Sequence, residues 1–122
     1  MIQGKFGEED ELFFEIELIS AEELELPVDA MLDTGFSGWL AIDNQDVEGL
    51  GWSYLRKEPM RMAQGGDSTF NLHVGKVRID GQEFDIPVHA GEGVPEILIG
   101  RQWLKTRRLL VDMTSGVLTL GS

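Results

Sequence analysis

Apolar and polar residues alternate in short runs along much of this chain, and turn residues separate the runs. Within residues 12–19, Phe14, Ile16 and Leu18 fall on one side of an extended segment, while glutamates occupy the other side. A period of two residues is typical of a strand with one buried and one exposed face. We therefore predict a half-buried strand over residues 12–19.

Similar runs later in the chain predict more strands. They cover residues 24–32, 39–42, 77–79, 84–88, 109–111 and 117–120. Pro27 interrupts the first of these, and proline lacks the N–H group that a central strand would donate. This segment therefore suits a sheet edge or a bulge better than a central position.

Turn residues at fixed places connect these runs. Asp80–Gly81 is a favoured two-residue turn between two strand-like arms, so we expect a β-hairpin there. Asp43 can cap a short helical turn through Val47 that Gly49 and Gly51 would end. Residues 114–116 form a further turn, between the last two strands.

Many short strands with a turn about every ten residues indicate a closed, mostly antiparallel β fold. The chain has 122 residues. This length is near the usual size of one domain, so we expect a single domain over residues 1–122.

The composition excludes several classes of function. The formal net charge is −12, which argues against nucleic acid and anionic membranes as partners, since both require a basic face. The chain has no cysteine, so thiolate metal sites and disulfides are excluded. No apolar run approaches the roughly 20 residues that span a bilayer, and the first residues do not resemble a signal peptide. We expect a soluble, cytoplasmic protein.

Charge is unevenly distributed along the chain. Acidic residues are concentrated between Glu8 and Asp29, and a small basic cluster lies late in the sequence. That cluster comprises Arg101, Lys105, Arg107 and Arg108. The acidic segment has two interpretations, a solvated surface that maintains solubility or a face that favours cationic peptides.

The segment with the clearest chemistry is Asp33-Thr34-Gly35, which directly follows the apolar residues Met31 and Leu32. An aspartate where a buried strand ends can serve as a catalytic acid or base. Glycine at Gly35 would let a substrate backbone approach closely. The alternative is an ordinary turn, because these residue types are common in turns.

Hydrolysis of an amide by carboxyl groups alone requires two of them. Held about 3 Å apart, two carboxyl groups cannot both ionise, so they share one proton. This chain has one Asp-Thr-Gly triplet, and near Asp112 the aspartate and threonine are separated by Met113. The simplest second carboxyl is Asp33 of another copy, related by a two-fold axis.

A second segment, Leu98-Ile99-Gly100-Arg101, combines a strand-like run with glycine and the start of a short helix-like stretch. Together with residues 31–35 it resembles the two motifs of the retropepsin-like aspartic proteases, in the same order and at the expected separation. The resemblance spans most of the chain, and Asp-Thr-Gly-Phe-Ser-Gly looks most like the small bacterial members.

This resemblance implies a closed antiparallel acid-protease barrel with a short C-terminal helix, a homodimer, and a peptide or protein substrate. Asp33 would be the catalytic carboxylate, Thr34 would hydrogen-bond across the dimer interface, and Gly35 would offer its carbonyl to the substrate. Ile99 and Gly100 would pack around the active-site loop.

Arg101 matches an arginine that pairs, in the viral enzymes, with an acid a few positions beyond the catalytic triplet. Here that region reads Phe36-Ser37-Gly38 and contains no acid. Arg101 is therefore left without an assigned partner, and a plain surface residue at the start of a helix is the alternative. In the same viral enzymes the terminal strands of both subunits interleave, and residues 117–120 have suitable character for this.

The segment 60–70 predicts a hairpin with adjacent glycines at its tip. Its position between the two motifs resembles the flap that closes over substrate in this family. The substrate-binding residues would be Gln64, Gly65, Gly66 and Asp67. An ordinary surface hairpin is the alternative.

His73 and His89 are far apart, with no carboxylate pattern typical of a metal site, so we expect no metal and no cofactor. Two functions are consistent with the sequence. The first is a homodimeric aspartic endopeptidase, and the alternative is a non-catalytic peptide-binding or dimerisation module with the same fold.

Overall fold

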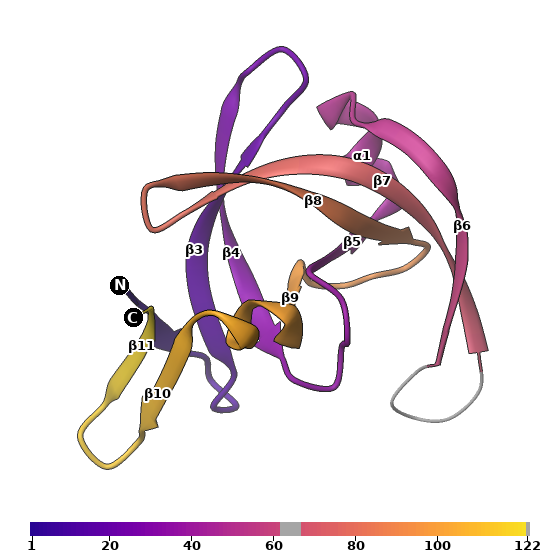
Figure 1. Ribbon diagram of the computed structural model, residues 1–122. Coiled ribbons are helices and arrows are strands. Elements are labelled where there is room, and N and C mark those ends of the chain that lie inside the picture. Colours follow the sequence, from indigo (N-terminus) through magenta and orange to yellow (C-terminus); the bar gives the residue numbers. More distant parts are fainter. Residues whose placement is uncertain (62–66, 122) are drawn as a thin grey trace.

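The computed structural model describes residues 1–61 and 67–121, which form strands with two short helical segments (Figure 1). The strands of the barrel and its extensions are β2 (Lys5–Phe6), β3 (Leu12–Ile19), β4 (Glu25–Asp33), β5 (Leu40–Asp43), β6 (Ser53–Arg61), β7 (Asp67–Ile79), β8 (Gln82–Gly91) and β9 (Leu98–Gly100). The remaining elements are β1 (Ile2–Gln3), α1 (Asn44–Leu50), the 3-10 helix η1 (Arg101–Lys105), β10 (Arg108–Asp112) and β11 (Val117–Gly121).

The larger sheet has the order β2-β3-β4-β9-β5-β8-β7-β6, and a further pairing of β3 with β7 closes it. Six strands therefore form a closed barrel, as the turn spacing predicts. The expectation of an antiparallel barrel is wrong in part, because β4–β9 and β5–β8 are parallel pairs. The first parallel pair exists because β9 inserts between β4 and β5. The second exists because β5 pairs with β8, the last strand of the antiparallel run β6–β7–β8 that follows α1, and not with the next strand of the chain.

The alternation in β3 gives the predicted half-buried strand. Phe14, Ile16 and Leu18 are buried while Glu15 is exposed. β4 pairs with β3 over most of its length but with β9 only at residues 31–33. Pro27 lies in the part of β4 that pairs on one side only, which agrees with the predicted edge position.

Local turn signals are accurate in this chain. Asp80 and Gly81 both have positive φ angles and connect β7 to β8, as a two-residue hairpin turn requires. Asp43 is the N-cap of α1, and its side chain accepts a hydrogen bond from the Gln45 N–H. Gly51 ends this helix with a φ of 69°, whereas Gly49 lies inside it, so only one of the two glycines is a terminator.

The core lies inside the barrel and continues beneath η1. The short helix predicted after Gly100 is this 3-10 helix, and it places Trp103 in the core with an exposed fraction of 1%. The Trp103 indole packs edge-on against Trp39 and Phe84, and its N–H donates to the Trp39 carbonyl at 2.9 Å. η1 is thereby fixed to the residues that precede β5.

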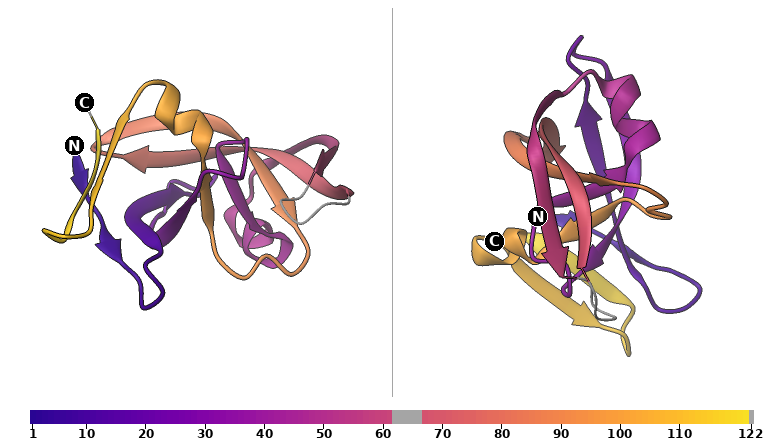
Figure 2. Two further views of the ribbon diagram at one scale, coloured as in Figure 1. Left: turned by 90° about the horizontal axis from the view of Figure 1, so that it is seen from below. Right: turned by 90° about the vertical axis from the view of Figure 1, so that its right-hand side faces the viewer.

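The N-terminal and C-terminal strands form a separate three-stranded sheet with the order β1-β11-β10. Its two chain ends lie side by side in the views of Figures 1 and 2. Leu118 and Leu120 of β11 are buried against the barrel. Within the described ranges, no helix has the length and apolar character to cross a membrane.

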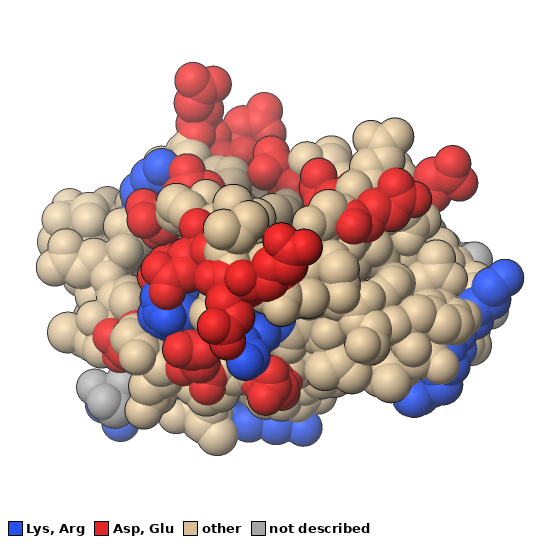
Figure 3. Space-filling model, turned by 90° about the horizontal axis from the view of Figure 1, so that it is seen from above, with Lys and Arg blue, Asp and Glu red and all other residues tan. Residues whose placement is uncertain are grey.

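Acidic side chains gather on part of the face shown in Figure 3, where they surround a few basic groups. Arg78 forms ion pairs with Glu17, Glu25 and Glu83, at distances from 2.7 to 3.4 Å. The hydrogen bonds that the Arg78 guanidinium donates to Glu25 and Glu83 raise the pKa of Arg78. Part of the early acidic segment is therefore paired within the chain.

Candidate active site

The two predicted motifs lie next to each other because β4 and β9 pair in parallel. Leu32 is opposite Ile99 and Asp33 is opposite Gly100. The loop after Asp33 then folds over the end of β9, and the Phe36 carbonyl accepts a hydrogen bond from the Arg101 N–H at 3.0 Å. The Gly100 N–H donates to the Trp39 carbonyl at the same distance. Residues 33–39 are therefore anchored to the second motif by main-chain bonds.

Gly100 has no room for a side chain at this crossing. A Cβ atom there would lie 2.0 Å from the Gly38 carbonyl oxygen, which is backbone and cannot rotate away. The Gly100 φ of −94° is ordinary, so the requirement for glycine is steric and not conformational. Ile99, the residue before Gly100, is fully buried.

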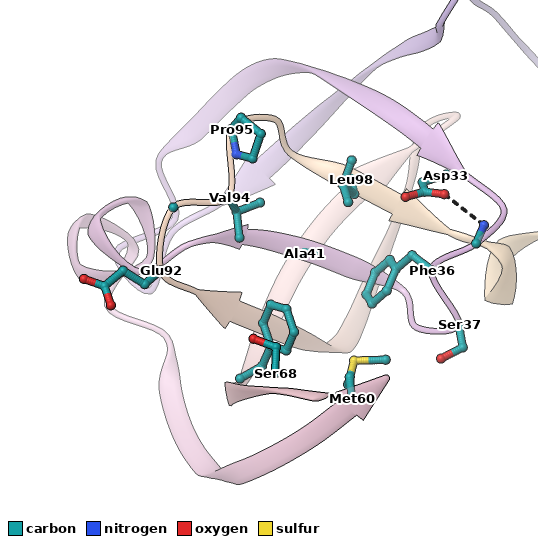
Figure 4. Close-up of a pocket in the computed structure, with 13 residues that line it drawn as sticks. Asp33, Phe36, Ser37, Ala41, Met60, Ser68, Glu92, Val94, Pro95 and Leu98 are labelled. Carbon is teal, nitrogen blue, oxygen red and sulfur yellow. Dashed lines mark hydrogen bonds between the residues drawn. The ribbon is translucent and has the colours of Figure 1, made fainter. Parts of the chain in front are cut away.

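The Asp33 side chain is partly exposed, and its Oδ1 accepts a hydrogen bond from the Gly35 N–H at 2.9 Å (Figure 4). Among residues 1–61 and 67–121, its Oδ2 atom has no hydrogen-bond partner. A carboxylate held by one oxygen keeps the second available for water or another carboxyl group.

Arg101 has a main-chain partner, which the sequence did not reveal. Its Nη1 donates to the Thr34 carbonyl at 3.2 Å, and the neighbouring Gln102 donates from Nε2 to the Ser37 carbonyl at 3.1 Å. In the described part of the chain Arg101 forms no ion pair with an acid. Both side chains fix the active-site loop, while Thr34 and Gly35 themselves are exposed.

A cavity of about 230 Å³ begins at Asp33 (Figure 4). Its lining includes Phe36, Ala41, Met60, Phe70, Val94 and Leu98. In Figure 4, Asp33 lies at one end beside Leu98 and Phe36, and Glu92 lies at the other end with its side chain pointing outward. A carboxylate next to a cavity with mostly apolar walls can bind and orient an extended chain with an apolar side chain.

The two strands of the hairpin predicted over residues 60–70 are present in the structure. β6 and β7 pair in antiparallel fashion up to Met60 opposite Ser68 and Arg61 opposite Asp67. Met60 and Ser68 line the cavity, so the arms reach the site. The predicted substrate-binding residues Gln64, Gly65 and Gly66 lie outside the described residues, and Asp67 is the first residue of β7.

His89 in β8 is buried, with an exposed fraction of 6%. Its Nε2 lies 3.1 Å from Glu58 Oε2 of β6. The rings of Phe36 and Phe70 both meet the imidazole edge-on, at centroid distances of 5.4 and 6.1 Å. Burial lowers the pKa of His89, and the charge of Glu58 opposes this shift only in part.

His73 of β7 is opposite Val88, the residue next to His89, so the two histidines are neighbours in the sheet and not far apart as expected. The His73 ring packs edge-on against Tyr54 and not against the His89 cluster. Among the described residues, His, Asp and Glu side chains do not gather in groups of three or more with the spacing of metal ligands.

Sequence reasoning did not identify several residues around the cavity. Phe70 and the loop of residues 92–95 line it, and Glu58 of β6 reaches His89 of β8 across the intervening strand β7. The loop carries a recognisable signal, since glycines and a proline directly precede the second motif. The partnership of Glu58 with His89 depends on strand pairing over a long sequence separation and has no local signal.

The chain is similar in fold to three solved structures. A retropepsin-like aspartic protease from Rickettsia conorii matches with a TM-score of 0.64 and 19% identity, over 99% of this chain and 92% of that one. The protease of EIAV in complex with the inhibitor HBY-793 has a TM-score of 0.62 and 14% identity, covering 83% of this chain and 91% of its own. The Simian Foamy Virus (mac) protease has a TM-score of 0.53 and 15% identity, covering 80% and 99%.

No protein-family model and no curated protein sequence matches the chain. At identities below 25% these similarities concern the fold and not the activity. The two adjacent motifs, the inserted strand β9 and the agreement with these three structures show that this chain has a retropepsin-like fold.

Proposed function

We propose that this protein is a homodimeric aspartic endopeptidase that activates water between Asp33 and Asp33 of the partner subunit. The observation that carries the proposal is the position of the Asp33 carboxylate and its single hydrogen bond. The Gly35 N–H holds one oxygen, and the carboxylate lies at the end of a cavity with mostly apolar walls. One such carboxyl is half of the pair that amide hydrolysis requires.

In the proposed reaction the two carboxyl groups share one proton. The ionised carboxylate accepts a proton from a bound water molecule, whose oxygen attacks the substrate carbonyl carbon. The protonated carboxyl donates its proton to the carbonyl oxygen, which gives a neutral tetrahedral intermediate. The newly protonated carboxyl group then donates its proton to the amide nitrogen, while the other carboxylate accepts a proton from a hydroxyl of the intermediate. The carbon–nitrogen bond breaks, the products are a carboxylic acid and an amine, and one proton is again shared by the pair.

The surrounding residues have supporting roles in this proposal. Thr34 hydrogen-bonds across the two-fold axis, and Arg101 keeps the Thr34 carbonyl in place through the bond described above. Gly35 and the residues Gln64 to Asp67 bind the peptide main chain as an added strand. The cavity takes one apolar side chain of the substrate.

A second function is supported by one departure from the viral pattern. Phe36, Ser37 and Gly38 provide no acid for Arg101, whose observed partner is the Thr34 carbonyl. An interface that differs from that of the viral enzymes is consistent with a peptide-binding or dimerisation module that has no turnover.

An Asp33→Asn variant separates the two functions. We expect it to remain dimeric and to lose hydrolysis of a peptide library between about pH 4 and 7, by a factor on the order of 10² or more, because amide nitrogen cannot exchange the proton. Asp46→Asn is the matched control, since Asp46 is an exposed aspartate in the first turn of α1 and lies away from the cavity. Absence of hydrolysis by the unaltered dimer at every pH would favour the binding module.

A further inference from the structure

The terminal sheet has one long unpaired edge. β11 lies between β1 and β10, so both of its sides are occupied within one chain. In the described part of the chain β10 pairs with β11 alone. Figures 1 and 2 show that the β10–β11 hairpin projects from the barrel beside the two termini. The N–H and C=O groups on the outer edge of β10 are therefore available to another strand.

This hairpin also exposes apolar side chains. The exposed fractions are 50% for Leu110, 40% for Val111 and 50% for Met113. Proteins usually protect a free edge with a charge at its centre, and lysine is the common choice. The central residue of β10 is Leu110, so this protection is absent at the point where another strand would pair.

The sequence of β10 is complementary to itself when read in opposite directions. It runs Arg108-Leu109-Leu110-Val111-Asp112, with a basic residue at one end and an acidic residue at the other. In an antiparallel pair centred on Leu110, Arg108 is opposite Asp112 of the partner subunit at both ends. Leu109 is then opposite Val111, and the two copies of Leu110 meet on the axis.

Asp112 retains its charge in this position. Its Oδ1 accepts hydrogen bonds from the Thr114 hydroxyl at 2.6 Å and from the Thr114 and Ser115 N–H groups at 3.1 and 3.3 Å. These bonds lower the pKa of Asp112, with the Thr114 hydroxyl as the main cause. The carboxylate is thus fixed at the end of the strand, and Arg108 at the other end is exposed.

We propose that β10 is the surface through which two copies of this chain associate, as an antiparallel strand pair with a two-fold axis at Leu110. The occupant of the free edge is a second copy because the charges and the apolar centre of β10 match those of β10 itself. This inference deepens the proposed function and rests on it for the homodimer. The association differs from interleaved termini, for which β11 offers no free edge.

Charge reversal at either end of β10 tests this register. Arg108→Asp would place two carboxylates opposite each other at both ends of the strand pair, and Asp112→Arg would place two guanidinium groups there. We expect each variant alone to dimerise more weakly, on the order of tenfold or more, since two attractive contacts become repulsive. An equal mixture of the two variants should form heterodimers, and the double variant R108D/D112R should form homodimers again. Sedimentation velocity at micromolar concentration measures all four.

Lys105→Asp is the matched control, because Lys105 is exposed at the end of η1 and undergoes the same charge reversal outside β10. Its dimer should be unchanged. Asp112→Arg also removes an acceptor for Thr114, so Asp112→Asn supplies a variant that keeps the amide oxygen and loses only the charge. It should weaken the dimer less than the reversal does.

The proposal is overturned if the unaltered chain is monomeric, if the single reversals leave the dimer intact, or if neither the mixture nor the double variant restores it. Failure of the proposed function has a different result. If the charge reversals weaken and restore the dimer as expected but the dimer hydrolyses no peptide, only the proposed peptidase activity is contradicted. If the dimer is active and Arg108→Asp does not weaken it, only the β10 pairing is contradicted.

Discussion

At position 100 the backbone passes so close to the Gly38 carbonyl that a single methyl group cannot be accommodated without moving the loop that carries Asp33. Replacing Gly100 with alanine forces one of these two main-chain segments to shift. We expect Gly100→Ala to lower the free energy of unfolding by about 1–3 kcal/mol, as for other overpacked positions, and to reduce peptide hydrolysis more than this loss explains. Chemical denaturation and an activity assay at matched folded fraction measure both effects.

Gly49→Ala is the appropriate control for this substitution. Gly49 lies inside α1, and a Cβ atom there would have no neighbour within 4 Å. Alanine is the better helix former, so this variant should gain about 0.5–1 kcal/mol of stability. A Gly100→Ala protein as stable and as active as the parent would contradict the steric role assigned to Gly100.

Single residues were predictable from the sequence where their reason is local. The Asp43 cap, the Asp80–Gly81 turn and the placement of Asp33 at a strand end all depend on chemistry within a few positions. The bond from Arg101 to the Thr34 carbonyl was not predictable, because it joins residues 67 positions apart and its acceptor is a main-chain oxygen. Any residue at position 34 would present the same carbonyl.

At the scale of elements, most strand positions follow from alternation, but their order in the sheet does not. β9 has only three residues. Its apolar run predicts a strand but does not indicate which strands pair with it. Its insertion between β4 and β5 depends on the whole barrel closing. The parallel pair β4–β9 results from this insertion, so the antiparallel expectation was wrong at the strand end that carries Asp33.

A contact between two titratable side chains, Glu58 of β6 and His89 of β8, connects β6 to the barrel. The groups that face His89 are Glu58, which favours its protonation, and Arg56, which opposes it, while Phe36 and Phe70 cover the ring. Burial dominates and lowers the pKa of His89 below its ordinary value of 6.5. The unfolded chain therefore binds a proton at a higher pH than the folded chain does.

It follows that the folded state loses stability as the pH falls below about 6.5. We expect His89→Gln to make the unfolding free energy depend less on pH between about 7.5 and 5.5, even if the variant also changes the stability at pH 7.5. Glu58→Gln should make this pH dependence stronger, since the charge that favours protonated His89 is removed. Denaturant titrations across this range measure the slopes, and a slope that His89→Gln leaves unchanged would contradict the assignment.

At the scale of the whole molecule, the proposed function requires two copies of the chain, because each copy supplies one of the two carboxyl groups. The chain has 122 residues and a single Asp-Thr-Gly triplet, and its barrel is like that of the retropepsin-like protease from Rickettsia conorii. The net charge of −12 opposes association of two copies, so an attractive surface is required. β10 combines an apolar centre with opposite charges at its ends and is suited to that role.

The most direct test of the account is whether catalysis requires Asp33 from both subunits. Unaltered chain and Asp33→Asn chain are mixed at constant total concentration, allowed to exchange subunits, and assayed for peptide hydrolysis. A shared pair predicts that activity falls as the square of the unaltered fraction, to about one quarter in an equal mixture, because only dimers with two intact carboxyl groups act. Activity that falls linearly, to about one half, would mean that each Asp33 works alone and would contradict the account.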